Sequence, residues 1–170
     1  MEIVIVKIDF SGSALKWLWL TILFLILDQV TKHWVAGTFE LYETLPVMPY
    51  FNLFYTHNTG AAFSFLADQG GWQRWFFAII AALASGLFTY WLAKTPASNK
   101  VLGIGFALML SGAIGNLIDR VLLGYVIDFL DFYVGTAHWP AFNVADSVIF
   151  IGAALMIYDS FTNESTDSKK

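Results

Sequence analysis

Four long apolar segments are the feature that most constrains the fold of this chain. They lie at about residues 14–35, 72–93, 101–120 and 143–160. A helix needs about 20 apolar residues to cross the roughly 30 Å hydrocarbon core of a bilayer. The composition agrees, because 58% of the residues are hydrophobic and only 13% are charged, against about 25% charged in soluble domains. We therefore predict an all-α membrane protein with four transmembrane helices, forming one integral membrane domain over residues 1–170.

The connections between these segments are uneven in length and character. The start of the chain, within residues 1–13, alternates weakly (EIVIVKIDF) and predicts an interfacial strand or helix. The longest connection, 36–71, contains a strand-like stretch, FNLFYT (51–56), followed by the turn-like HNTG (57–60). The third apolar segment is rich in glycine and alanine, which favours close helix packing in lipid.

The first apolar segment has one alternative interpretation, a cleaved signal peptide, because Lys16 precedes an uncharged run. No clear small-x-small cleavage site follows that run, although such signals require one. We therefore favour a retained transmembrane helix.

The distribution of lysine and arginine predicts the orientation in the membrane. Four spans place both termini on one side, and that side carries six basic residues (Lys7, Lys16, Lys94, Lys100, Lys169 and Lys170). The other side carries three (Lys32, Arg74 and Arg120). Because cytoplasmic loops are enriched in basic residues, we expect cytoplasmic termini and outward-facing long loops. The net charge is −4 and no basic stripe is present, so nucleic acid is not an expected partner.

Polar residues inside the apolar segments gather at one end of the predicted bundle. They are Asp28, Lys32, Arg74, Asn116, Asp119, Arg120, Asn143 and Asp146. A charged side chain in hydrocarbon costs roughly 2.5–3.5 kcal/mol at mid-bilayer, so such a group indicates a function. A one-sided site favours an enzyme. A small ion or proton translocator using Asp28, Asp146 and Arg120 is the main alternative, and a scaffold without chemistry leaves the buried acids unexplained.

Two pairs repeat the i,i+4 spacing of a helix face. Asp28 and Lys32 can neutralise each other where desolvation is costly, or they can orient a site. Asn116 and Arg120 form the second pair, in which Arg120 binds a phosphate headgroup or a carboxylate, or extends to the interface. Asp119 is interpreted as a helix-end partner and left out of the site.

Asp128 and Asp146 are the predicted catalytic pair. Asp146 opens the fourth span and must point into the bundle, while Asp128 lies in a connection that can fold back over that end. Two nearby carboxylates in a low-dielectric site cannot both ionise easily, so one stays protonated while the other acts as a base, as in aspartic proteases. A buried acid paired with a basic group is the structural alternative for each, and Asp131 is a lower-ranked rival to Asp128.

Other chemistries have less support in the sequence. His33, His57 and His138 lack metal-ligand spacing. Ser64, Ser111 and Ser147 have no neighbouring histidine, although a Ser147–Lys32 dyad stays open. The chain has no cysteine, and the sequence implies no cofactor and no metal.

Five motifs in order resemble those of the bacterial lipoprotein signal peptidases, also called type II signal peptidases. They are DQVTK (28–32), NTGAAFS (58–64), GNLIDR (115–120), VIDF (126–129) and FNVAD (142–146), and together they extend over most of the chain. The resemblance implies a four-helix aspartic endopeptidase of the bacterial inner membrane. It also implies an extracytoplasmic β-sheet platform, a short periplasmic helix and an active site near the periplasmic surface.

The resemblance further implies the reaction and the residues that perform it. The family removes signal peptides from prolipoproteins by cutting before a diacylglyceryl-modified cysteine. Asp128 and Asp146 occupy its catalytic positions. Positions that bind substrate or orient the site are occupied by Asp28, Lys32, Asn58, Gly60, Asn116, Arg120 and Asn143. Ser111 and Val144 stand where many members have glycine and isoleucine or leucine. The expected partners are lipid-modified prolipoproteins and membrane lipids, and we expect a monomer.

Overall fold

The computed structural model describes residues 12–60 and 71–167 of the chain, and it contains four long helices. A short 3-10 helix, η1 (Ala14–Trp17), leads into α1 (Leu18–Thr38). The others are α2 (Trp72–Lys94), α3 (Lys100–Leu122) and α4 (Val144–Asp167). All four are long and apolar enough to cross a membrane, so the predicted four-span fold class is confirmed.

The ends of the helices differ from the predicted spans by a few residues, and α4 continues furthest, past the expected end at residue 160. The strand or helix expected near the N-terminus falls on residues 1–11, which lie outside the described residues.

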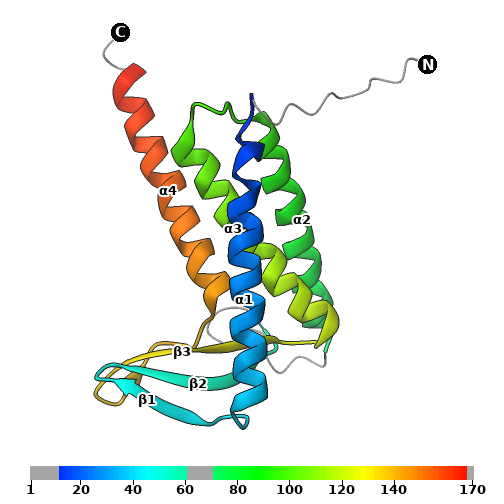
Figure 1. The fold of residues 1–170 in the computed structure, drawn as a ribbon, viewed down its shortest axis with the longest axis vertical. Helices are drawn as coiled ribbons and strands as arrows, with labels where there is room; N and C mark the ends of the chain where they lie inside the picture. Colours follow the sequence, from blue (N-terminus) through cyan, green and yellow to red (C-terminus); the bar gives the residue numbers. More distant parts are fainter. Residues whose placement is uncertain (1–11, 61–70, 168–170) are drawn as a thin grey trace, which may run out of the picture.

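Helix α3 is the centre of the bundle and packs against α1, α2 and α4 (Figure 1). Within its apolar window 61% of the residues are buried, against 11–22% for the other three helices. The small residues of α3 allow the neighbouring helices to approach closely enough to bury it. A side chain at Gly112 would collide with the backbone of Ala145 and with Ile149, and one at Gly115 would meet the Asp28 carboxylate. The glycine-rich composition of this segment therefore sets the distance between helices.

The outward faces of the helices are apolar. Leu83 is 69% exposed and Phe150 is 77% exposed, and many other large apolar side chains on α1, α2 and α4 are exposed in the same way. Because a soluble protein rarely exposes so much contiguous apolar surface, these faces indicate contact with lipid. The chain is a multi-pass membrane protein.

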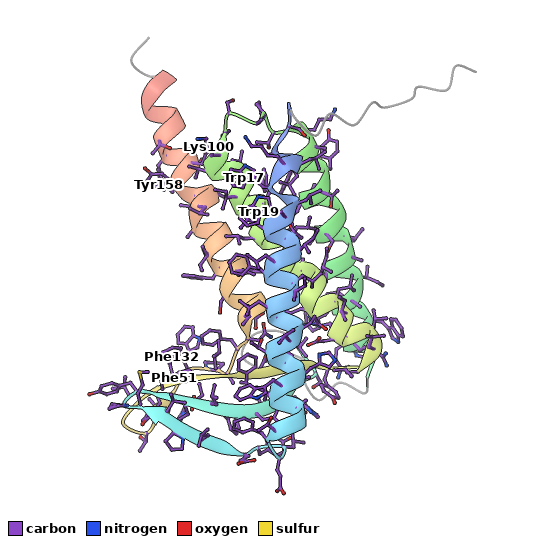
Figure 2. All side chains as sticks on the ribbon, viewed as in Figure 1. Trp17, Trp19, Phe51, Lys100, Phe132 and Tyr158 are labelled. Carbon is purple, nitrogen blue, oxygen red and sulfur yellow. The ribbon has the colours of Figure 1, made fainter. Side chains whose placement is uncertain are left out.

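A four-stranded antiparallel sheet covers one end of the bundle (Figure 1). Its strands are β1 (Thr44–Met48), β2 (Phe51–Asn58), β3 (Val126–Val134) and β4 (Ala137–His138), in the order β1-β2-β3-β4. The start of α1 and the far end of α4 lie at the opposite end of the bundle. In Figure 2, Phe51 and Phe132 lie in the sheet, where their ring centroids are 4.9 Å apart.

The strand predicted at 51–56 is confirmed as β2, whereas the nine-residue strand β3 was not predicted from its own residues. The segment VIDFLDFYV is rich in β-branched and aromatic residues, which is the signal that could have identified it. The short periplasmic helix implied by the family resemblance is not among the helices of residues 12–60 and 71–167.

The sheet is fixed to the bundle by an apolar cluster at the junction. Val35 and Phe39 at the end of α1 pack with Tyr55 of β2 and with Ile127 and Phe129 of β3. Burial of an apolar side chain of this size contributes roughly 1.5–3 kcal/mol. The cluster therefore holds β3 rigidly against the helix ends.

Candidate active site

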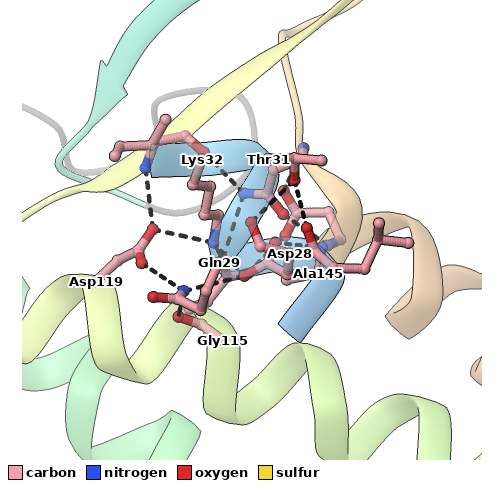
Figure 3. Close-up of polar contacts among 12 residues, drawn as sticks. Asp28, Gln29, Thr31, Lys32, Gly115, Asp119 and Ala145 are labelled. Atoms are coloured by element: carbon pink, nitrogen blue, oxygen red, sulfur yellow. Dashed lines mark hydrogen bonds and ion pairs between the residues drawn. The ribbon is translucent and has the colours of Figure 1, made fainter. Parts of the chain in front are cut away.

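A buried ion network occupies the sheet end of the bundle (Figure 3). The Lys32 ammonium lies 2.9 Å from carboxylate oxygens of both Asp28 and Asp119, and it donates to the Asn116 side-chain oxygen at 3.0 Å. The i,i+4 ion pair predicted between Asp28 and Lys32 is confirmed. Gln29 donates to both Asp28 and Asp119. Since every acid here has a basic or amide partner, the buried charges are compensated.

The Asp28 and Asp119 carboxylates also hold backbone from other elements. Asp28 accepts a hydrogen bond from the backbone N–H of Ala145 at 2.8 Å, and Asp119 accepts one from that of Ile127 at 3.2 Å. The network thereby fixes the first turn of α4 and the start of β3 to the bundle.

Asp128 lies in β3, and two asparagine amides hold its carboxylate. Asn58 donates to one oxygen at 2.9 Å and Asn143 to the other at 2.6 Å. In the β2–β3 register, Asp128 is opposite Thr56 and Asn58 is opposite Val126. Asn58 and Asp128 are therefore diagonal neighbours on one face of the sheet, which is how their side chains meet.

Asp146 lies in the first turn of α4, where Asn143 caps the helix. The Asn143 side-chain oxygen accepts from the Asp146 N–H at 2.9 Å, and an Asp146 oxygen accepts from the Asn143 N–H at 3.3 Å. This reciprocal pair resembles a capping box, which satisfies otherwise unpaired donors at a helix start. A carboxylate in this position is also favoured by the helix dipole.

Asn143 stands between the two aspartates because its neighbour Phe142 is hydrogen-bonded to β3. The backbone of Phe142 makes three hydrogen bonds with Phe129 and Leu130, at 2.8–3.1 Å. The completely buried Asn143 side chain then reaches Asp128, while its backbone and side-chain oxygen hold Asp146. Asn116 links Asp146 to the ion network. Its amide donates to Asp146 at 2.8 Å, and its side-chain oxygen accepts from Lys32.

Arg120 lies at the end of α3 beside these groups. Its guanidinium donates to the carbonyl oxygens of Asn116 at 3.3 Å and Gly60 at 3.1 Å, and it stacks over Phe77. Asn58 also accepts from the Gly60 N–H at 3.0 Å. From α2, Arg74 donates to the carbonyl oxygens of Arg120 and Val121 at 2.7 and 2.6 Å. The final turn of α3 is therefore held from two sides.

A groove of about 710 Å³ opens over Asp146. Its polar lining includes Asn58, Asn116, Arg120 and Asp146, and α4 supplies an apolar wall that includes Ile149, Phe150 and Ala153. This combination suits a substrate that has a hydrophobic body and a polar reacting bond.

The environment of Asp128 favours its protonated form. Burial is the largest cause and the charge of Asp146 the second, and together they raise the pKa of Asp128 from 3.8 to about 7 against the opposing hydrogen bonds from Asn58 and Asn143. A carboxyl with a pKa near 7 is still largely protonated at a pH where an ordinary aspartate is ionised.

Two members of this cluster, Asp119 and Gln29, were not predicted from the sequence as site residues. Asp119, left out as a helix-end partner, shares Lys32 with Asp28, and Gln29 bridges the same two acids. Gln29 is in the motif DQVTK and Asp119 is in the motif GNLIDR, so their places in these motifs could have indicated them. Asp131 lies away from the cluster and binds Asn52 and His138 instead. Within residues 12–60 and 71–167, no three His, Asp or Glu side chains are grouped so as to hold a metal ion.

Solved structures of similar shape are bacterial membrane enzymes. One, described as a bacterial membrane enzyme at 2.3 Å resolution, has a TM-score of 0.83 and 30% identity, and the match covers 95% of this chain and 98% of that one. A second, at 1.9 Å resolution, has a TM-score of 0.75 and 31% identity, with 89% and 97% covered.

Sequence relatives carry the name lipoprotein signal peptidase. The protein of Alteromonas mediterranea is 53% identical over 161 residues, covering 95% of this chain and 88% of that protein. The protein of Shewanella amazonensis is 50% identical over 163 residues, covering 96% and 97%. The family model for signal peptidase (SPase) II matches residues 20–162. With the resemblance of its motifs, its four spans and these relatives in agreement, the chain belongs to the signal peptidase II family, the lipoprotein signal peptidases.

Proposed function

We propose that this peptidase is an aspartic endopeptidase in which Asp128 and Asp146 activate water. The substrate is a prolipoprotein, and the bond cut lies on the N-terminal side of its diacylglyceryl-modified cysteine. The observation that carries the proposal is that one buried residue, Asn143, hydrogen-bonds both carboxylates, and that one of the two, Asp146, lines a groove with an apolar wall.

The chemistry needs one proton on the pair. The ionised carboxylate takes a proton from water as the water oxygen attacks the scissile carbonyl, and the protonated carboxyl gives its proton to the carbonyl oxygen. The resulting tetrahedral intermediate collapses when the first carboxyl protonates the amide nitrogen and the second carboxylate recovers a proton from a hydroxyl. The C–N bond breaks, releasing the signal peptide with a new carboxyl group and the mature chain with a new amine.

The remaining cluster residues orient this pair. Asn58, Asn116 and Asn143 hold the carboxylate oxygens. Lys32 anchors α1 to α3 through Asp119, and Asp28 anchors α1 to α4 through the Ala145 N–H. Arg120 lines the groove, and its guanidinium donates to the Gly60 carbonyl oxygen. A translocator using Asp28, Asp146 and Arg120 is set aside because the chain belongs to a peptidase family.

The proposed location is the bacterial inner membrane, with both termini cytoplasmic and the sheet in the periplasm. Support comes from the six-to-three distribution of basic residues and from the position of the sheet at the bundle end opposite to the start of α1.

The dyad is tested with Asp128→Asn and Asp146→Asn, assayed on a lipidated precursor with mass spectrometry of both products. Asparagine keeps the shape but cannot act as a base or share a proton, so we expect turnover to fall at least about 10²-fold in each variant. Asp159→Asn is the matched control, because Asp159 bonds Asn99 at the far end of the bundle.

Near-wild-type turnover in either dyad variant, with unchanged melting behaviour, would remove that aspartate from the mechanism. Products cut at any other bond would contradict the proposed cleavage position.

A further inference from the structure

A second hollow in the sheet lies next to the catalytic groove. It has a volume of about 520 Å³ and is lined by Thr44, Phe54, Asp131, His138 and the segment 139–141. Residues 139–141 line the catalytic groove as well. One short segment of the chain therefore borders both spaces.

We infer that this hollow is a subsite for the polypeptide that follows the cut, with His138 as its recognition residue. The inference rests on the proposed function, since it concerns the same substrate and extends the binding site beyond the reacting bond.

The hollow contains a built polar pair. The buried Asp131 carboxylate accepts from the Asn52 amide at 2.8 Å and lies 2.9 Å from His138 Nδ1. The His138 ring is also stacked on Tyr133, with 5.2 Å between centroids. A carboxylate on one ring nitrogen fixes the tautomer, so Nδ1 carries a proton and Nε2 is left to face a ligand.

His138 has the exposure that a recognition residue needs. Its side chain is 51% exposed, and within the described part of the chain Nε2 has no hydrogen-bond partner. Asp131 thus orients the ring through Nδ1, and among the described residues Nε2 is available to a ligand. A neutral Nε2 accepts a hydrogen bond from a peptide N–H, and a protonated one donates to a peptide carbonyl.

The position of the second hollow favours the chain after the cut, rather than the signal peptide, as its occupant. The catalytic groove has its apolar wall on the membrane helix α4, which suits the hydrophobic signal segment and the lipid. The second hollow is formed by β1, β2, β3 and β4 and by the segment 139–141, beyond the helices. A substrate held in the membrane at its N-terminal part must leave the bundle at this end, so the segment past the reacting bond crosses residues 139–141 into the second hollow.

The test uses two lipidated precursors with the same signal sequence and lipid. One ends as an amide at the modified cysteine, and the other continues with a stretch of mature chain. The full-length enzyme is compared with His138→Ala, Asp131→Asn and the control His33→Ala, which removes an exposed histidine from α1 outside both hollows.

For the longer precursor we expect His138→Ala to raise KM about threefold to tenfold with kcat little changed, which is the effect of losing one or two hydrogen bonds. Asp131→Asn should give a smaller increase. For the precursor that ends at the modified cysteine, the wild type and the three variants should have the same kcat/KM. His33→Ala should match the wild type on both precursors.

Equal KM for wild type and His138→Ala on the longer precursor would overturn the subsite, as would an equal loss on both precursors. Failure of the proposed function is a separate result, because then the wild type would cleave neither precursor at the expected bond. Thermal melting of each variant identifies any that is misfolded, and His138→Gln, which keeps a hydrogen-bonding side chain, should recover part of the lost affinity.

Discussion

Four acids at the sheet end of the bundle have two kinds of partner. Asp28 and Asp119 are paired with Lys32 at 2.9 Å. Asp128 and Asp146 are instead held by asparagine amides. A full positive charge stabilises an ionised carboxylate far more than a neutral amide does. Asp28 and Asp119 are therefore suited to stay ionised in a structural ion pair, and Asp128 and Asp146 are suited to exchange a proton.

The pH dependence of cleavage should report this difference. Because burial and the Asp146 charge raise the pKa of Asp128 to about 7, the active form with one shared proton is lost as pH rises through that value. Turnover should therefore fall about tenfold per pH unit well above 7, and fall again at acid pH once both carboxyls are protonated. The measurement is kcat/KM from pH 4 to 9 on one precursor. A rate that keeps rising above pH 8 would contradict a dyad that needs its proton.

Lys32 gives a prediction about stability. Lys32→Met leaves two buried acids without their cation, which should reduce the free energy of unfolding by about 3–5 kcal/mol. Adding Asp119→Asn removes one of the orphaned charges, so the double variant should recover part of that loss. Chemical unfolding of the four proteins in one detergent completes the cycle. Strictly additive effects would show that Lys32 and Asp119 do not interact.

At the scale of elements, the site depends on where helices and strands begin and end. The start of α4, the end of α3 and the β2–β3 pair meet there, and each contributes side chains from its end. Arg74 at the start of α2 holds the last turn of α3 through the carbonyl oxygens of Arg120 and Val121. A cation at a helix C-terminus is favourable both for hydrogen bonding and for the helix dipole.

We predict that Arg74→Ala lowers stability by about 1–3 kcal/mol, the loss of two charge-assisted hydrogen bonds, and lowers turnover several-fold because Arg120 loses its support. Lys94→Ala, at the other end of the same helix, removes a cation that lies over Tyr90 and serves as the control. Thermal melting and cleavage are measured on the same preparations. If Arg74→Ala and Lys94→Ala behave alike, the capping role is wrong.

At the scale of the whole molecule, the bundle is asymmetric along its length. The polar cluster and sheet lie at one end, and an apolar core of η1, α2 and α3 residues such as Ala14, Leu92 and Phe106 lies toward the other. Within the described residues, the buried acids of the site therefore lie toward one membrane surface. The proposed orientation places that surface in the periplasm.

The orientation is testable because the chain contains no cysteine. Single cysteines in place of the exposed residues Glu43, in the connection before β1, and Ser98, between α2 and α3, should react from opposite sides of the membrane. In intact cells an impermeant thiol reagent should label the Glu43 variant alone, and both variants after permeabilisation. Labelling of the Ser98 variant in intact cells would reverse the orientation.

Much of this architecture could be predicted from the sequence because lipid imposes simple rules. Apolar segments of about 20 residues predict spans, and the polar residues at their ends predict one membrane surface as the site. The motif resemblance named Asp128 and Asp146, together with the residues around them. The i,i+4 spacing by itself predicted the Asp28–Lys32 pair, since helical periodicity is a local property.

The partners of each acid depend on long-range packing, which local sequence patterns do not specify. Asp128 and Asp131 stand three residues apart, and the sequence ranked Asp131 below Asp128 without excluding it. Their strand turns such neighbours to opposite faces, so Asp128 meets Asn58 and Asn143 while Asp131 meets Asn52 and His138. The pairing of Lys32 with Asp119, 87 positions along the chain, likewise depends on how closely α1 approaches α3. Local patterns determine periodicity and burial in lipid, whereas long-range packing determines which buried acid receives a cation and which receives only amides.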